Sequence, residues 1–89
     1  MSKSYFISFE GGEGTGKSTQ IKLLKNYLTQ KSFNVFVTRE PGGSDGAESI
    51  RKLLVEGNVN RWDAETESLL MYAARRDNYV RFIKPNLDR

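Results

Sequence analysis

The spacing of apolar residues changes along the chain and predicts an alternation of strands and helices. Residues 5–9 (Tyr-Phe-Ile-Ser-Phe) form a short, nearly continuous apolar run, which is typical of a strand buried on both faces. Residues 35–38 (Val-Phe-Val-Thr) predict a second strand of the same kind. From residue 18 to about residue 31, apolar side chains recur at helical spacing, at Ile21, Leu24 and Leu28. This part of the chain therefore predicts a β-α-β unit with parallel strands.

Two more helices are expected after the second strand. The Pro-Gly-Gly sequence at residues 41–43 prevents regular structure from continuing. Asp45, followed three residues later by a glutamate, resembles a capping box and predicts a helix to about Val55. Asp63 can cap a third helix that runs to about Lys84, where the next residue, a proline, disturbs or ends it.

A phosphate-binding motif lies between the first strand and the first helix. Residues 11–18 (Gly-Gly-Glu-Gly-Thr-Gly-Lys-Ser) match the pattern G-x-x-x-x-G-K-S/T. Glycines allow successive backbone N–H groups to turn toward phosphate oxygens, and the following helix directs its positive end to the same place. Lys17 is expected to reach the terminal phosphates and Ser18 to join the Mg²⁺ shell. Because a strand and a helix flank the motif, nucleotide binding is favoured over a glycine-rich turn with a surface lysine.

Composition narrows the possible chemistry. The 89 residues suffice for one small domain at most. The net charge of +3 suits small anionic ligands but does not indicate nucleic-acid binding. The sequence has no cysteine and no histidine, which excludes thiolate metal sites and imidazole bases, but phosphoryl transfer needs neither. The apolar stretch near the N-terminus is too short for a signal peptide, and no run approaches membrane-spanning length, so a cytoplasmic location without membrane association is expected.

Several charged residues are candidates for binding a second ligand. Arg39 follows the second strand, at the edge where α/β sheets bind ligands, and Arg51 and Arg75 lie on the two later helices. Guanidinium groups suit phosphate and carbonyl oxygens, although a single exposed arginine often has no specific role. Glu13 is unusual because a carboxylate among phosphates repels them unless it faces a hydroxyl group or a cation. Its position therefore indicates a functional role.

Three blocks of sequence together resemble bacterial thymidylate kinases. They are residues 9–19 around the phosphate motif, residues 38–43 (Thr-Arg-Glu-Pro-Gly-Gly) and residues 69–76 (Leu-Leu-Met-Tyr-Ala-Ala-Arg-Arg). The resemblance extends from about residue 5 to the last residue, and the second and third blocks are more specific than the first. It implies an α/β P-loop NTPase fold of the nucleoside monophosphate kinase type, with three layers and a parallel sheet. Residues 1–89 are expected to supply only the β-α-β start and two acceptor-site helices.

The resemblance also implies an activity and a set of site residues. The activity is transfer of the γ-phosphoryl group of ATP to dTMP, with Mg²⁺, to give dTDP for dTTP synthesis. The implied catalytic residues are Lys17, Glu13 and Arg39. The residues implied to bind ATP are Gly11, Gly12, Glu13, Gly14, Thr15, Gly16, Lys17, Ser18 and Thr19, with Ser18 at the metal. Those implied to bind dTMP are Glu13 near the 3′-hydroxyl, Arg39 and Arg51 around the phosphate and sugar, Arg75 at the thymine carbonyl, and Met71 with Tyr72.

The sequence departs from the family pattern at two points. Many family members stack an aromatic ring on thymine four residues before the thymine-binding arginine, where this chain has Met71. The base platform is therefore assigned to Met71 and Tyr72 together. Family members are also longer, so residues 1–89 are expected to be the N-terminal part of one kinase domain and inactive in isolation. The resemblance further implies a homodimer formed through the second and third helices. Two alternatives remain: another P-loop kinase of small molecules or nucleotides, and a non-catalytic nucleotide-binding remnant.

Overall fold

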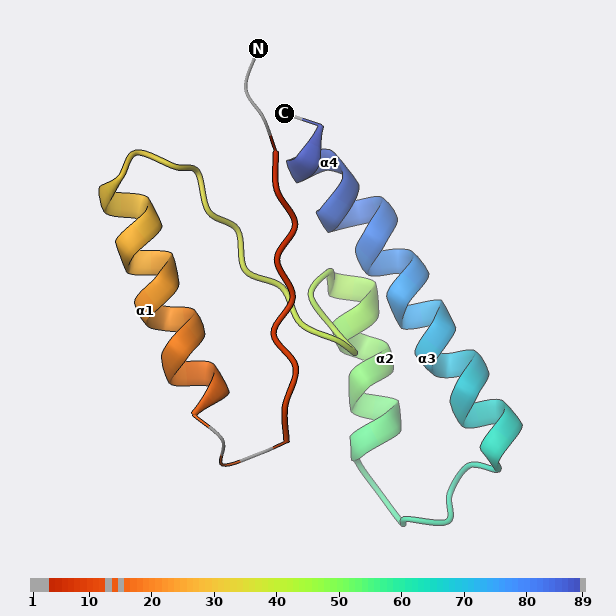
Figure 1. Ribbon diagram of the computed structural model, residues 1–89. Coiled ribbons are helices and arrows are strands. Elements are labelled where there is room, and N and C mark those ends of the chain that lie inside the picture. The colour runs from red at the N-terminus through yellow and green to blue at the C-terminus, as the bar shows by residue number, and fades with distance from the viewer. Residues whose placement is uncertain (1–3, 13, 15, 89) are drawn as a thin grey trace. The chain divides into compact units, whose positions relative to one another are not determined.

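The computed structural model describes residues 4–12, 14 and 16–88, and these divide into two compact units (Figure 1). The first unit comprises residues 1–37 and the second residues 38–89. The first contains the predicted phosphate loop, and the second contains all three candidate arginines. None of the helices formed by the described residues has the length and apolar content needed to cross a membrane.

The first unit contains one helix, α1, over Lys17–Gln30. Its bounds agree with the helix predicted over residues 18 to about 31. The helix ends in a Schellman motif: the N–H of Phe33 donates to the carbonyl of Leu28 and that of Ser32 to the carbonyl of Thr29, each at 3.1 Å. Ser32 occupies the left-handed position of the motif with φ 70°. No residue of α1 is buried, so the local capping motif, rather than tertiary packing, defines its C-terminal end; Gly16 at the N-cap makes no side-chain capping bond.

The two predicted strands do not form. Among the described residues there is no β-strand, and residues 5–9 and 35–38 run without regular secondary structure. The β-α-β unit expected from the sequence is therefore not shown by this structure. An apolar run favours a strand only when a neighbouring strand supplies a ladder of backbone hydrogen bonds and a face to cover it. Apolar side chains in the first run instead stay exposed, Tyr5 by 70% and Phe6 by 62%.

The second unit begins with a loop that leads into α2, Asp45–Val55. The loop contains a cis peptide bond between Glu40 and Pro41. Ser44, rather than the predicted Asp45, caps α2, because its hydroxyl accepts the N–H of Ala47 at 3.2 Å. The predicted helix is confirmed, but its cap lies one residue earlier than the capping-box pattern indicated.

The third predicted helix is confirmed as α3, Ala64–Asn78, and Asp63 caps it by accepting the N–H of Thr66 at 2.7 Å. The chain stays helical beyond α3, first as the π-helical turn η1, Tyr79–Ile83, and then as α4, Lys84–Leu87. The proline after Lys84 thus disturbs the helix without ending it there. A proline lacks an N–H and crowds the carbonyl four residues earlier, and the wider π turn relieves that crowding.

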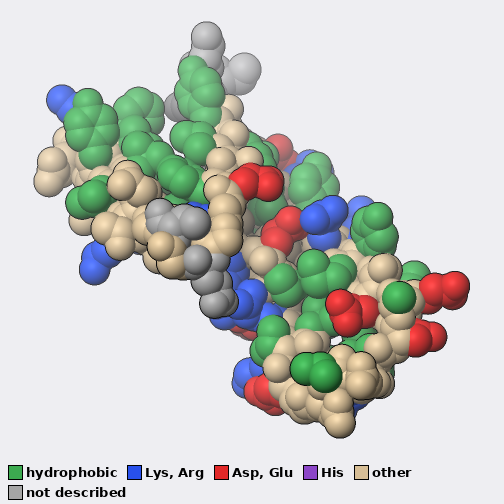
Figure 2. All heavy atoms as spheres, turned by 60° about the horizontal axis from the view of Figure 1, so that its bottom comes forward, with side chains coloured by type: hydrophobic (Ala, Val, Ile, Leu, Met, Phe, Trp, Pro, Cys, Tyr) green, Lys and Arg blue, Asp and Glu red, His purple; other side chains and the backbone are tan. Residues whose placement is uncertain are grey.

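The core of the second unit is small and lies where α2 and α3 pack together (Figure 1). Ala47 on α2 and Ala74 on α3 are completely buried. Small side chains at both positions allow close approach of the two helix backbones. Many large apolar side chains remain exposed, as the green surface in Figure 2 shows. Hydrogen bonds also join the loop at residues 38–44 to α3.

Candidate active site

The described part of the phosphate loop has the backbone conformation that its glycines predict. Gly14 and Gly16 have φ values of 79° and 81°, in the left-handed region that L side chains rarely adopt. A β-carbon at either position would meet no atom within 4 Å, so backbone conformation rather than crowding favours glycine there. Glu13 and Thr15 lie outside the described residues.

Lys17 lies across the loop that precedes it. Its ammonium group donates to the carbonyl oxygen of Gly11 at 3.1 Å, bringing the last and first parts of the motif together. Lys17 is also the first residue of α1, followed by the exposed Ser18 and Thr19, and the first turn of the helix contains no acidic residue. A cationic side chain beside a helix N-terminus is suited to binding phosphate.

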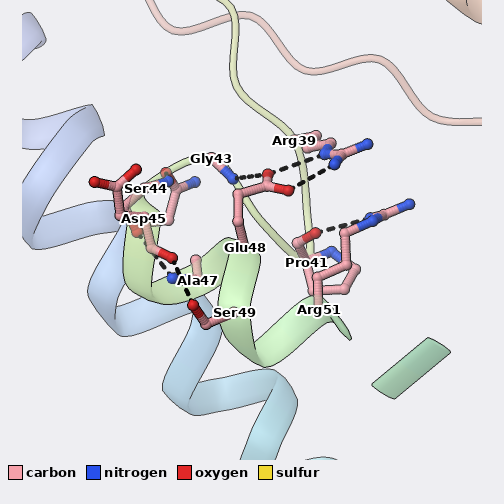
Figure 3. Close-up of polar contacts among 10 residues, drawn as sticks. Arg39, Pro41, Gly43, Ser44, Asp45, Ala47, Glu48, Ser49 and Arg51 are labelled. Carbon is pink, nitrogen blue, oxygen red and sulfur yellow. Dashed lines mark hydrogen bonds and ion pairs between the residues drawn. The ribbon is translucent and has the colours of Figure 1, made fainter. Parts of the chain in front are cut away.

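In the second unit, Glu48 on α2 connects Arg39 to the loop backbone (Figure 3). The guanidinium of Arg39 donates to both carboxylate oxygens, from Nε at 3.0 Å and from Nη2 at 2.6 Å. The N–H of Gly43 donates to the same carboxylate at 2.7 Å. These bonds, with Arg39 the larger influence and Gly43 the next, lower the pKa of Glu48 to about 2. The carboxylate is therefore charged at all ordinary pH values.

The other two candidate arginines contact the same loop. Arg51 on α2 donates from Nη1 to the carbonyl oxygen of Pro41 at 2.8 Å. Arg75 on α3 forms a fork with Glu40, with donor–acceptor distances of 3.0 and 3.1 Å. This pairing raises the pKa of Arg75. The structure thus brings Arg39, Arg51 and Arg75 together around residues 39–43.

Met71 and Tyr72 occupy different faces of α3. Met71 is four residues before Arg75 and seven before the buried Asn78, so these three side chains follow one stripe of the helix. Met71 is 37% exposed, whereas Tyr72 is 65% exposed. Tyr72 lines a separate shallow depression together with Ala64, Glu65, Ser68 and Leu69.

Sequence reasoning missed a buried polar cluster beneath the loop. Asn78 is fully buried, and its Oδ1 accepts from the Thr38 hydroxyl at 3.0 Å and from the Ser44 N–H at 3.2 Å. The Ser44 hydroxyl also donates to Asp77 at 2.6 Å. The position of Asn78 on α3, three residues after Arg75, was a signal that it shares a face with the candidate site. Its role in holding the loop depends on a contact across forty residues of sequence.

Glu40 and Glu48 were also missed as partners of the arginines. Both carboxylates fall inside or near the blocks singled out in the sequence, but neither is at helical spacing from the arginine that it binds. No signal in the sequence predicts these pairs. Lys17 belongs to the first unit, whereas the arginines belong to the second. In the part of the chain that the structure describes, no cluster of three or more acidic, histidine or cysteine side chains could hold a metal.

Comparison with known proteins identifies the family. The sequence profile described as "Thymidylate kinase" matches residues 9–89. The chain therefore belongs to the thymidylate kinase family, which implies the P-loop NTPase fold.

Three curated relatives carry the name thymidylate kinase. The protein from Caulobacter vibrioides is 62% identical over 89 residues, covering 100% of this chain and 43% of the relative. The protein from Rhizorhabdus wittichii is 55% identical over 83 residues, which is 93% of this chain and 40% of the relative. That from Ruegeria pomeroyi is 56% identical over 82 residues, which is 92% of this chain and 39% of the relative. The chain thus spans less than half the length of the curated relatives that it matches.

Proposed function

We propose that the protein to which these residues belong is a thymidylate kinase that transfers the γ-phosphoryl group of ATP to dTMP, giving dTDP and ADP. The match of residues 9–89 to this family carries the proposal. The phosphate loop supports it, because phosphoryl transfer depends on positioning and charge stabilisation, and both come from main-chain amides and cationic side chains. The product dTDP would feed dTTP synthesis.

The ATP phosphates are assigned to residues 11–19. The loop amides and the N-terminus of α1 would surround the phosphates, and Lys17 would stabilise negative charge that develops during transfer. The contact between Lys17 and Gly11 supports this role, because it already holds the ammonium over the loop. The exposed Ser18 hydroxyl, at the start of α1, is suited to contact Mg²⁺. When bound, Mg²⁺ neutralises phosphate charge.

The acceptor nucleotide is assigned to the arginines around residues 39–43. Arg39 and Arg51 would bind the phosphate and sugar of dTMP, and Arg75 would donate to the thymine carbonyl. Glu13 would approach the 3′-hydroxyl, where a carboxylate serves as acceptor and where its charge is away from the phosphates. Of these residues Lys17, Glu13 and Arg39 are assigned to catalysis.

Met71, rather than Tyr72, is proposed as the platform for thymine. It shares the stripe of α3 that carries Arg75, so a base held by Arg75 would lie over the thioether. Tyr72 points toward a different surface of the helix. Exchange of Met71 for phenylalanine should maintain or improve the KM for dTMP, whereas Tyr72→Ala should leave it within about twofold.

Three further properties go with this proposal. Residues 1–89 are assigned to the N-terminal part of one kinase domain, and we expect them to be inactive alone. A cytoplasmic location follows from the nucleotide substrates, with neither nucleic acid nor membrane as a partner. The exposed apolar side chains of α2 and α3 support homodimer formation through these helices.

The test uses the full-length polypeptide that contains this sequence. It is offered ATP, Mg²⁺ and a panel of nucleoside monophosphates, and ADP release is measured for each acceptor. We expect dTMP to have the highest kcat/KM, because Arg75 can donate to the thymine C4 carbonyl but not to the cytosine C4 amino group. A higher kcat/KM for another acceptor would contradict the proposal.

A further inference from the structure

Glu48 has more contacts than an acidic residue in the first part of a helix requires. It accepts two hydrogen bonds from Arg39 and one from the backbone of Gly43. A carboxylate near the N-terminus of a helix interacts favourably with the helix dipole, whatever other groups it contacts. The fork instead fixes both the rotation and the direction of one particular guanidinium.

The glycine pair in the loop makes this arrangement possible. A β-carbon on Gly42 would collide with Oε2 of Glu48 and would lie 3.2 Å from Cγ of Arg39. Gly42 also has φ 140°, and Gly43 has φ 100°. Only glycine therefore fits where the loop backbone passes the pair of hydrogen bonds between Arg39 and Glu48. The Gly-Gly sequence and Glu48 thus contribute to one arrangement.

The fork leaves one edge of the Arg39 guanidinium for a ligand. Glu48 engages the edge formed by Nε and Nη2. In Figure 3 the remaining nitrogen, Nη1, points away from Glu48 and from α2, in the same direction as the end of the Arg51 side chain. Arg51 lies near enough to contribute to the charge environment of Glu48. A phosphate contacted by Arg39 would therefore meet a guanidinium that is already oriented.

We propose that Glu48 is a positioning residue of the acceptor site, which holds Arg39 in the orientation that binds the acceptor phosphate. This inference rests on the proposed function, in which Arg39 binds that phosphate. Glu48 itself touches no substrate. Its effect on phosphoryl transfer passes through Arg39.

The test compares two isosteric variants of the full-length protein, Glu48→Gln and Glu67→Gln. Glu67 is the matched control because it is the fourth residue of α3, as Glu48 is of α2, and it is exposed. Steady-state kinetics are measured with dTMP varied at saturating ATP and with ATP varied at saturating dTMP. For Glu48→Gln we expect the KM for dTMP to rise about tenfold to a hundredfold, because an amide cannot accept two charge-assisted bonds. The KM for ATP and all constants of Glu67→Gln should stay within about twofold of wild type.

A double-mutant cycle with Arg39→Gln distinguishes positioning from simple structural support. If Glu48 acts through Arg39, adding Glu48→Gln to Arg39→Gln changes the KM for dTMP by less than about twofold. The proposal would be overturned if the effects of the two substitutions on the KM for dTMP multiplied in the double mutant. It would also be overturned if Glu48→Gln left the KM for dTMP unchanged, or raised the KM values for dTMP and ATP equally. Should Glu48→Gln fail to fold, Arg39→Lys tests the same fork from the other side, and an unchanged KM for dTMP would again refute it.

The outcome is separable from the proposed function. If another nucleoside monophosphate proves to be the acceptor, the assignment of dTMP fails. The phosphate that Arg39 contacts is common to all such acceptors, so the same KM pattern is then expected for that nucleotide. An unchanged KM for it in Glu48→Gln would refute the positioning role independently.

Discussion

The contacts within the first unit differ in kind from the contacts within the second unit. In the first unit the Lys17 ammonium donates to the carbonyl of Gly11 within the same loop, and α1 buries no residue. In the second unit the loop at residues 38–44 is tied to α3 by Thr38–Asn78 and Ser44–Asp77, contacts that join residues 40 and 33 positions apart. The comparison shows that the proposed ATP site depends on local backbone geometry, whereas the proposed acceptor site depends on distant side chains.

The largest expected effect concerns the local site. In the full-length protein, Lys17→Ala should lower kcat with ATP and dTMP by about a hundred- to a thousandfold, the usual loss when one preorganised donor is removed from a transition state. Thermal unfolding should be nearly unchanged, because the hydrogen bond from the Lys17 ammonium to the Gly11 carbonyl is exposed to solvent. Lys22→Ala, on an exposed position of α1, is the control. Near-normal turnover of Lys17→Ala would contradict the assignment of the ATP site.

Substitution of a glycine in the second unit should instead lower the stability of the protein. Gly43→Ala places a methyl group against the Thr38 hydroxyl and the amide of Asn78, at a φ of 100°. We expect the free energy of unfolding to fall by about 3 kcal/mol, from backbone strain and crowding together. Gly57→Ala separates the two causes, because Gly57 has φ 90° but meets only the flexible Arg61 side chain. That control should lose only about 1 kcal/mol in denaturant titrations. Equal losses would show that crowding at Gly43 is unimportant.

The helix cap should give an intermediate effect. Ser44→Ala removes the acceptor for the N–H of Ala47 and the donor to Asp77, so we expect a loss of about 1–2 kcal/mol by chemical denaturation. Ser49→Ala is the matched control on the same helix, since the Ser49 hydroxyl is exposed and donates only to the carbonyl of Asp45. It should change stability by less than about 0.5 kcal/mol. A Ser44 variant as stable as this control would show that the contacts between the loop and α3 add little to stability.

The smallest expected effect is the pH dependence of stability that Glu48 creates, which is absent at neutral pH and develops only in acid. Its folded-state pKa of about 2 lies below the ordinary value of 4.5. The stabilisation that it provides is therefore present above about pH 4.5 and is lost as pH falls toward 2. Titration of stability from pH 6 to pH 2 should show an acid limb in wild type that is reduced in Glu48→Gln. An identical limb in both proteins would contradict the pairing with Arg39.

The features predicted correctly from the sequence are those that depend on nearby residues. The bounds of α1 and α2 follow from apolar spacing, and Asp63 follows from capping chemistry. The helix predicted to run to about Lys84 is α-helical only to Asn78 and continues as η1 and α4. The phosphate loop was predicted because its glycines and Lys17 lie within one short segment. The structure gathers Arg39, Arg51 and Arg75 around one loop, and their role as ligand residues stays a prediction.

The features missed depend on contacts that the sequence does not encode at a fixed spacing. Asn78 was not predicted, because its burial results from the packing of α3 against the loop. The acidic partner of Arg75, Glu40, lies 35 positions away. The expected strands are absent from the described residues, since a ladder depends on a second segment of backbone and not on apolar composition.

The π-helical turn at Tyr79–Ile83 changes the directions in which side chains after it project around the helix axis. An α-helix advances about 100° per residue, and a π turn accommodates one residue more than an α turn of the same rise. A helical wheel drawn from Ala64 therefore assigns the wrong azimuth to side chains beyond Ile83. Removing a single residue within the turn would allow it to become an α turn and would leave α4, Lys84–Leu87, at nearly the same azimuth.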